Sequence, residues 1–197
     1  MSEEKQSARS GSKNGSKTQS LVLLLIGVGL VLAAVAAFLS IPQAQADVQQ
    51  ISSAAQPLAV DFPAPQVQLS DLNNQPVALS DYKGQVVLYN AWATWCPPCQ
   101  AEMPTLEAYY QAHHQEGFVV VAIEDGEPLA TVAAFVKSYG LSFPVWPDPK
   151  WVATTAFKSE VLPSSFVIDR AGRVVLTWSG PISREMLEKY VTPVIAR

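Results

Sequence analysis

The sequence predicts an α/β domain in which helices cover both faces of a central mixed sheet. Two mostly apolar runs, residues 85–92 and 118–123, are typical of strands buried on both faces, and each is followed by a segment with helical periodicity. Two further strands, residues 165–168 and 173–178, flank an Asp-Arg-Ala-Gly segment that indicates a hairpin. A strand–helix–strand–helix order that ends in a hairpin gives parallel and antiparallel neighbours in one sheet.

The remaining elements are predicted from alternation, turn residues and caps. Residues 67–69 and 77–79 alternate in hydrophobicity on either side of an asparagine pair, which indicates an N-terminal β-hairpin. Pro104 implies a kink in the first helix, Gly140 fits the carboxyl-terminal cap of the second, and Ser183 fits the N-cap of the last. The predicted helices are residues 102–116, 129–139, 151–157 and 184–191.

Composition is that of one ordinary folded domain. The chain has 197 residues, is 49% hydrophobic and carries a formal net charge of −4. Residues 61–197 are predicted to form the domain, and they are numerous enough to bury a core of their own. They contain 14 acidic and 9 basic residues, a net charge of −5. Because no basic run or aromatic-interleaved basic patch occurs, no nucleic-acid partner is expected.

The N-terminal 60 residues are predicted to tether this domain to a membrane. Residues 1–20 are polar and are expected to form a disordered cytoplasmic tail. Residues 21–41 carry no charge and, at about 1.5 Å per residue, span the roughly 30 Å core of a bilayer. Because basic residues precede this segment, it is predicted to be a single-pass anchor with the domain on the extracytoplasmic side. Residues 42–60 are predicted to be a flexible linker.

A cleaved signal peptide is the alternative for this region. Ala44-Gln45-Ala46 before Asp47 fits a small-x-small cleavage site, after which the domain would be secreted. The apolar run exceeds the roughly 7–15 residues usual for a signal peptide, which favours a retained anchor. Both interpretations place the domain outside the cytoplasm, where disulfides persist.

The only two cysteines, Cys96 and Cys99, are separated by two prolines and lie where the first buried strand gives way to a helix. Open α/β sheets place their active sites at such carboxyl ends of strands. Free N–H groups and the helix dipole stabilise a thiolate there and lower the thiol pKa from about 8.5. Cys96 is therefore the predicted nucleophile in disulfide exchange, and Cys99 is predicted to resolve the mixed disulfide. Pro97 suits the first helical turn, where no N–H is needed.

Three other uses of the two cysteines are less favoured. Zinc usually needs four ligands, and only the adjacent His113 and His114 could complete a set. Covalent haem attachment requires a histidine directly after the second cysteine, where Gln100 stands. A static disulfide across so short a loop removes little entropy from the unfolded chain. Redox chemistry without a metal or other cofactor is therefore predicted.

The order of elements and several motifs resemble the thioredoxin superfamily, and more narrowly the TlpA/ResA-type membrane-anchored thiol–disulfide oxidoreductases. The resemblance covers about residues 61–197, and it implies a thioredoxin-like fold with an N-terminal β-hairpin extension. It is carried by the segments 69–72, 77–84, 92–99 and 162–166, together with Pro104.

The resemblance also implies roles for individual residues. Pro163 would be a cis-proline facing the cysteines, and the backbone of Leu162 would pair with an extended substrate. Glu127 would be a carboxylate near the dithiol that relays a proton as Cys99 attacks, a role for which Glu124 competes.

Two further residues of the motif are expected to contact the substrate. Trp95, with Trp92 beneath it, would shield the sulfur atoms and offer an apolar rim for docking. Pro97, between the two cysteines, would belong to the same surface. Core packing alone is the other explanation for Trp92.

Proteins of this type reduce disulfides in exported proteins, for example in apocytochrome c, and receive electrons from a membrane donor. Protein thiols or disulfides and a membrane electron donor are thus the partners that the resemblance implies. Peroxiredoxins share the fold, but Ala93 and Tyr89 replace the Thr and Pro that their peroxidatic motif needs before the cysteine. A non-catalytic binding module with this fold is the other alternative.

Overall fold

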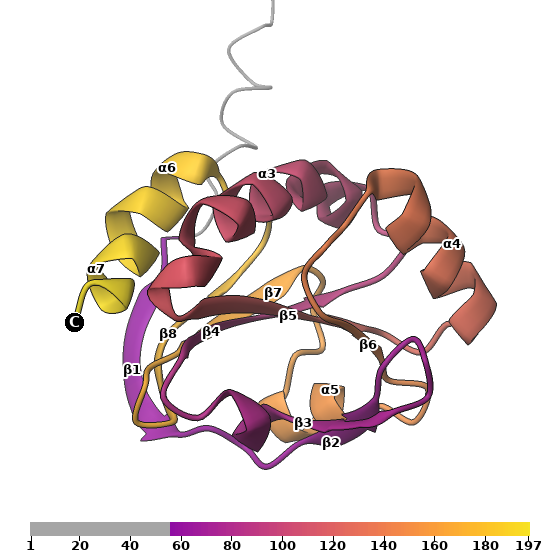
Figure 1. Ribbon diagram of the computed structural model, residues 1–197, viewed down its shortest axis with the longest axis horizontal. Coiled ribbons are helices and arrows are strands. Elements are labelled where there is room, and N and C mark those ends of the chain that lie inside the picture. The colour runs from indigo at the N-terminus through magenta and orange to yellow at the C-terminus, as the bar shows by residue number, and fades with distance from the viewer. Residues whose placement is uncertain (1–55) are drawn as a thin grey trace, which may run out of the picture. The chain divides into compact units, whose positions relative to one another are not determined.

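Six strands form the central sheet, in the order β1-β8-β7-β4-β5-β6 (Figure 1). The computed structural model describes residues 56–197. In the sheet, β4 and β6 lie parallel to β5, and all other neighbours are antiparallel, which confirms the predicted mixed sheet. The strands are β1 Leu58–Pro63, β4 Val86–Trp92, β5 Phe118–Glu124, β6 Val145–Pro147, β7 Ser164–Ile168 and β8 Arg173–Ser179.

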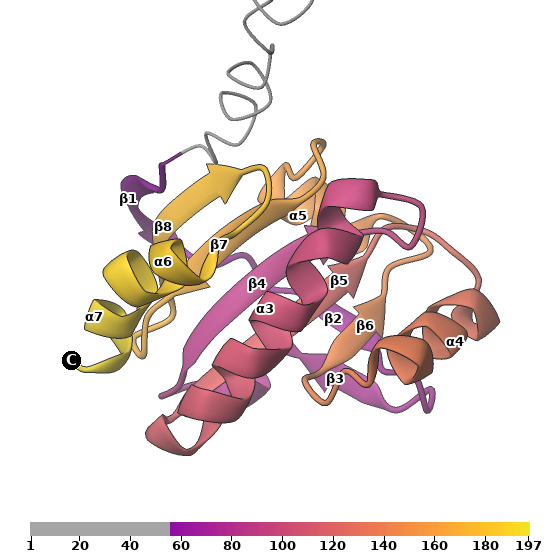
Figure 2. The ribbon, with the colours of Figure 1, turned by 90° about the horizontal axis from the view of Figure 1, so that it is seen from above.

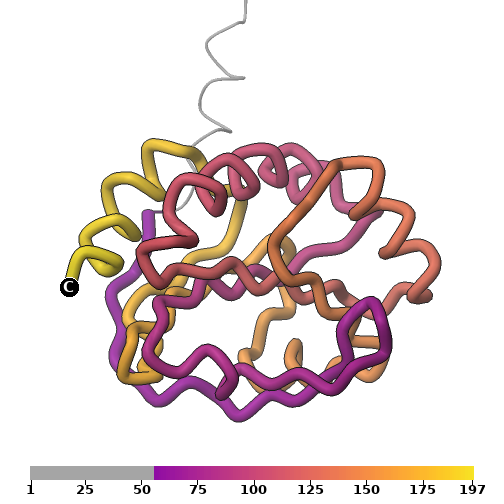
Figure 3. The backbone as a smooth tube through the Cα atoms, in the orientation of Figure 1, coloured from indigo at the N-terminus to yellow at the C-terminus, as the bar shows by residue number. Residues whose placement is uncertain are grey.

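Helices line one face of the sheet, and a shorter helix with a hairpin covers the other (Figure 1). Seen from above, α3 lies across β4 and β5, with α6 and α7 beside it (Figure 2). The hairpin of β2 and β3 and the short α5 lie on the opposite face (Figure 3). The helices are α3 Pro97–His113, α4 Leu129–Tyr139, α5 Val152–Phe157, α6 Arg184–Met186 and α7 Thr192–Ile195, with a π turn, η3, at Leu187–Val191. Two 3₁₀ turns complete the set, η1 Leu79–Tyr82 and η2 His114–Glu116.

The two central strands divide their side chains between two cores. Alternate residues of a strand point to opposite faces of a sheet, so an apolar run supplies both faces at once. One core, under α3, takes even-numbered residues of β4 and β5, such as Leu88, Trp92 and Val120. The other takes odd-numbered ones, such as Tyr89 and Val121. The predicted burial of these strands on both faces is confirmed.

The N-terminal hairpin is a separate two-stranded sheet, β2 Gln68–Ser70 and β3 Pro76–Ala78. Its turn is held by Asp71, whose Oδ1 accepts the N–H groups of Asn73 and Gln75 at 2.8 Å. The side chain of Tyr82, just after the hairpin, stacks on Trp146 of β6 with ring centroids 6.0 Å apart. The hairpin extension predicted from the sequence is therefore present and packs against the second face.

The structure extends several predicted elements. The first helix begins at Pro97, ahead of the predicted range 102–116, and Cys96 is its N-cap, as the position of the cysteine motif predicts. The linker was predicted to reach residue 60, but β1 begins at Leu58, because it pairs with β8 through Leu58 opposite Thr177. The last helical segment continues beyond residue 191 to Ile195, and Ser183 caps it by accepting the Met186 N–H at 3.2 Å.

Most predictions for the N-terminal region concern residues outside the range that the structure describes. These are the cytoplasmic tail at 1–20, the anchor at 21–41, the cleavage site after Ala46 and the linker up to residue 55. Across residues 56–197, no helix combines the length and the apolar character needed to cross a bilayer.

Candidate active site

The dithiol is positioned by the junction of β4 and α3. Cys96 is the N-cap of α3 in an extended conformation, and its Sγ accepts the Cys99 N–H at 3.3 Å. Pro97 and Pro98 fill the first two helical positions, where a missing N–H has no cost. The two cysteines form a disulfide, with Cα atoms 5.3 Å apart. The Cys96 sulfur thus lies at the positive end of a 17-residue helix, which stabilises a thiolate once the pair is reduced.

The two sulfurs differ in accessibility. Cys99 is 0% exposed, whereas Cys96 is 4% exposed and is flanked by exposed residues. Trp95 on one side is 64% exposed, and Pro97 on the other is also at the surface. An incoming protein therefore meets Cys96 first, and this favours Cys96 as the attacking sulfur.

The loop before β7 adjoins the dithiol. The Leu162–Pro163 peptide bond is cis, and Ser164 pairs with Ala91 near the end of β4. Leu162 packs against the core that contains both cysteines, and Pro163 is buried with its carbonyl accepting the Gly180 N–H at 2.8 Å. Within residues 56–197 the backbone N–H and C=O of Leu162 have no hydrogen-bond partner. These groups are the ones that, by the family resemblance, would pair with substrate.

Glu127 is bound to the segment that precedes Cys96. Its carboxylate accepts the backbone N–H and the hydroxyl of Thr94, both at 2.7 Å. Partial burial opposes ionisation, but the Thr94 hydrogen bonds outweigh it and hold the pKa of Glu127 below its ordinary value. Glu127 is therefore an ionised anchor for Thr94. The geometry favours this positioning role over the proton relay that the family resemblance implies for it.

Glu124, the competing candidate, is fully buried at the end of β5. Its two carboxylate oxygens accept the Glu127 N–H at 3.1 and 3.3 Å. Burial, followed by the nearby Glu127 carboxylate, raises the pKa of Glu124 to about 8. Glu124 therefore carries a proton at neutral pH and supports the loop that holds Thr94.

Glu102 is a third acidic residue, which sequence reasoning missed. It lies one helical turn after Cys99 on the buried side of α3 and is 1% exposed. Its Oε1 accepts from Asn90 Nδ2, and its Oε2 accepts from the Ile182 N–H, both at 2.8 Å. Burial raises the pKa of Glu102 to about 7, and these two hydrogen bonds partly oppose the rise. An acidic residue three positions after Cys99, beside the apolar Met103, was the available signal.

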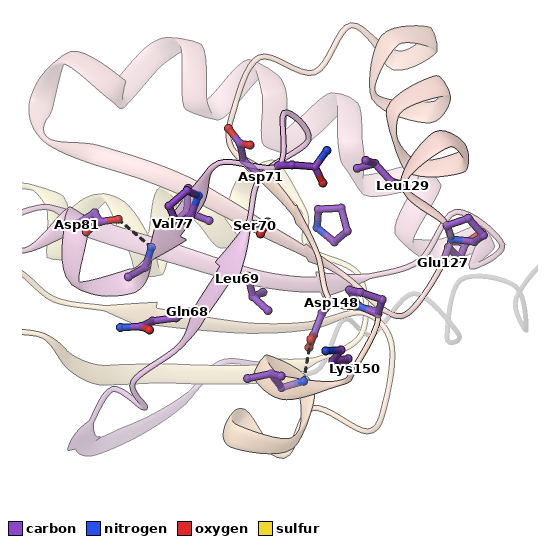
Figure 4. Close-up of a pocket in the computed structure, with 17 residues that line it drawn as sticks. Gln68, Leu69, Ser70, Asp71, Val77, Asp81, Glu127, Leu129, Asp148 and Lys150 are labelled. Atoms are coloured by element: carbon purple, nitrogen blue, oxygen red, sulfur yellow. Dashed lines mark hydrogen bonds between the residues drawn. The ribbon is translucent and has the colours of Figure 1, made fainter.

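A cavity adjoins the site without containing the dithiol (Figure 4). Its volume is about 790 Å³, and it lies between the β2–β3 hairpin, the start of α4 and the loop from β6 to α5. Two of its carboxylates serve local structure, because Asp81 accepts the Ala78 N–H and Asp148 accepts N–H groups at the start of α5. Glu127 is the residue that this cavity shares with the site. Among residues 56–197, no three His, Cys, Asp or Glu side chains cluster as metal ligands would.

The sequence profile of the AhpC/TSA family matches residues 60–177. The chain belongs to the AhpC/TSA family. Thiol-disulfide oxidoreductase ResA of Geobacillus kaustophilus is 34% identical over 137 residues, which cover 70% of this chain and 79% of that protein. The ResA of Bacillus subtilis is 37% identical over 128 residues, covering 65% and 72%.

A solved structure agrees with this family membership. A putative thiol:disulfide interchange protein DsbE from Chlorobium tepidum superimposes with a TM-score of 0.65 at 29% identity, covering 70% of this chain and 99% of that one. This AhpC/TSA family member therefore has the thioredoxin-like fold predicted from its sequence. It is a thiol–disulfide oxidoreductase, and Cys96 and Cys99 are its redox-active pair.

Proposed function

We propose that the chain is an extracytoplasmic reductase of protein disulfides, tethered to the membrane by residues 21–41. The observation that carries the proposal is the position of Cys96. It caps a long helix and is the more accessible sulfur of the pair. Leu162, whose backbone has no hydrogen-bond partner within residues 56–197, packs against the core cluster that contains Cys96. A thiolate at that point can attack a disulfide in an extended polypeptide that is held along the Leu162–Pro163 edge.

The reaction begins with the reduced pair. The Cys96 thiolate attacks one sulfur of the substrate disulfide, and the second substrate sulfur leaves as a thiolate. Cys99 then loses its proton and attacks Cys96 in the mixed disulfide. This step forms the Cys96–Cys99 disulfide and releases the first substrate sulfur as a thiolate. Two electrons pass from the dithiol to the substrate.

Glu102 is the group best placed to accept the Cys99 proton. It is one turn from Cys99 on the same side of α3, and it is buried away from water. Its pKa of about 7 lets the carboxylate gain and release a proton near neutral pH. Glu127 and Glu124 support this chemistry indirectly, by holding Thr94 two residues before Cys96.

Substrate binding is assigned to the surface around Cys96. Trp95 and Val161 are 64% and 59% exposed, and Pro97 is exposed between the cysteines. Exposed apolar side chains of this kind mark sites where proteins bind. The Leu162 backbone supplies directional hydrogen bonds, so the surface suits an unfolded or extended segment that contains cysteines.

The direction and the partners are proposed from the resemblance to TlpA/ResA-type proteins. We assign apocytochrome c, whose haem-binding cysteines must be reduced, as the type of substrate, and a membrane thiol donor as the source of electrons. The uncharged segment at 21–41, after a basic flank, supports the anchored location. Sequencing the mature N-terminus in membrane and soluble fractions tests this location. A soluble form that begins at Asp47 would contradict the anchor.

The partner is identified by trapping with Cys99→Ala. This variant cannot resolve the mixed disulfide, so the substrate stays bound to Cys96 and is named by mass spectrometry. Cys96→Ala is the matched control and traps nothing. Trapping by Cys96→Ala but not by Cys99→Ala would reverse the two roles.

The reduction potential of the pair tests the direction. Potentials among related proteins run from about −270 to −120 mV, and a reductase belongs to the lower part of that range. A potential above about −150 mV would overturn the reductive assignment. Rapid consumption of hydrogen peroxide without a dithiol donor would instead indicate a peroxidase.

A further inference from the structure

A buried polar cluster lies beneath the dithiol, on the face of the sheet that α3 covers. It consists of Asn90 on β4, Ser165 on β7 and Glu102 on α3, each at most 1% exposed. Asn90 and Ser165 are directly opposite each other in the antiparallel β4–β7 pair. A buried polar atom without a hydrogen-bond partner costs free energy, so the cluster favours the arrangement that pairs its atoms best in each charge state.

The nitrogen and the oxygen of the Asn90 amide differ in the number of hydrogen bonds that they make. Nδ2 donates to Glu102 Oε1 at 2.8 Å and to Ser165 Oγ at 3.1 Å, so both of its hydrogens are engaged. Oδ1 is buried and has no partner within the described residues. This arrangement suits an ionised Glu102, because a carboxylate only accepts hydrogen bonds.

A protonated Glu102 requires the opposite arrangement. Its new O–H is a donor, and the NH₂ group that faces it in the structure cannot accept. If the amide rotates by half a turn, Oδ1 faces both Glu102 and Ser165 and accepts from both hydroxyls. The Ile182 N–H continues to donate to Oε2 in either state, since that oxygen remains an acceptor.

We propose that Asn90 is a positioning residue whose amide turns over as Glu102 gains or loses a proton, with Ser165 following as acceptor or donor. The inference deepens the proposed function and rests on it for its purpose. When Cys99 gives up its proton, Glu102 becomes a carboxylic acid, and the turned amide stabilises that acid. When the proton leaves again, the amide returns and stabilises the carboxylate.

Few other titratable groups face this cluster. On α3 there are the two cysteines, which do not titrate while they are joined. On β5 there is Glu124, which lies one strand away and nearer the carboxyl end. From the segment that follows β8, only the Ile182 N–H reaches Glu102, and the nearby Arg184 is exposed. The oxidised protein therefore allows Glu102 and Asn90 to be followed without interference from thiols.

NMR of the oxidised full-length protein tests the proposal. The ¹³C shift of the Glu102 carboxyl reports its protonation, and nuclear Overhauser contacts from the Asn90 NH₂ group to Ser165 report the amide orientation. The expected result is one midpoint near pH 7 for both signals, with the contacts to Ser165 lost at low pH. A titrating Glu102 beside an Asn90 amide whose contacts stay constant would overturn the proposal.

Variants separate this role from general packing. Asn90→Leu removes the donor to the carboxylate and is expected to raise the Glu102 midpoint by about one to two pH units. Glu102→Gln is expected to abolish the transition at Asn90. Tyr89→Phe is the matched control, since Tyr89 directly precedes Asn90 in β4 but packs in the opposite core. A Glu102 midpoint that is unchanged or lowered in Asn90→Leu would refute the assignment. Because no substrate is present, failure of the reductase assays would leave this result intact.

Discussion

The buried Glu102 makes the stability of the oxidised protein depend on pH. Burial raises the pKa of Glu102 from 4.5 to about 7 in the folded state, whereas the unfolded chain keeps the ordinary value. Below pH 4.5 both states are protonated and folding carries no penalty from this group. Between pH 4.5 and 7 the folded state keeps a proton that the unfolded state loses, so the free energy of unfolding falls as pH rises.

The size of the effect follows from the shift. A difference of about 2.5 pKa units corresponds to about 3 kcal/mol in the free energy of unfolding, and this contribution is lost completely once the pH is above 7. Glu102→Gln retains the shape and carries no charge at any pH. Relative to this variant, the wild-type protein is therefore expected to lose about 3 kcal/mol between pH 4.5 and 8.

Urea unfolding at half-unit pH steps measures this difference. Both proteins are kept oxidised, and the difference between their unfolding free energies is plotted against pH. Taking the difference cancels the contribution of Glu124, which titrates in an overlapping range. A difference that stays constant from pH 4.5 to 8 would refute the reasoning, because Glu102 would then have the same pKa in the folded and the unfolded protein.

Two other substitutions test contacts outside the dithiol. Glu127→Gln leaves one acceptor oxygen for the two donors of Thr94, so hydrogen exchange of the Thr94 amide is expected to become about tenfold faster. An unchanged rate would show that Glu127 does not hold this segment. Arg170→Ala is expected to lower the unfolding free energy by about 2 kcal/mol, seen as a lower urea midpoint with an unchanged slope. An unshifted midpoint would contradict the clamp that Arg170 forms by donating to the carbonyls of Gly84, Glu116 and Ile195 at 2.9–3.0 Å.

The central elements were predictable because their signals are local. Residues 85–92 and 118–123 are mostly apolar runs. A strand that is buried on both faces needs apolar residues at almost every position, so each run can be recognised as a strand without knowing its neighbours in the sheet. Gly140 ends α4 in a left-handed conformation, with a φ of 63°, as the sequence predicts. The edge strands β1 and β6 were not predicted. β6 is only three residues long, and β1 is extended because it pairs with β8, which is distant in the sequence.

The acidic residues of the site show where sequence reasoning fails. Glu127 and Glu124 lie near each other in the sequence, and both are near the dithiol in space, but their pKa values shift in opposite directions. The cause is their surroundings, because Glu127 receives two hydrogen bonds from Thr94 whereas Glu124 is enclosed. Neither environment can be predicted from the residues next to Glu124 and Glu127 in the sequence.

By itself, the sequence determined the chemistry of this protein. Two cysteines at disulfide spacing, placed between a strand and a helix, specify a redox-active pair, because helix geometry alone sets the distance and the electrostatics of the thiolate. The tertiary structure decided which carboxyl group has the burial that the proposed proton transfer requires. Glu102 is buried only because α3, β4, β7 and the segment at Ile182 converge on it, and burial is what moves its pKa to the range in which it can exchange a proton.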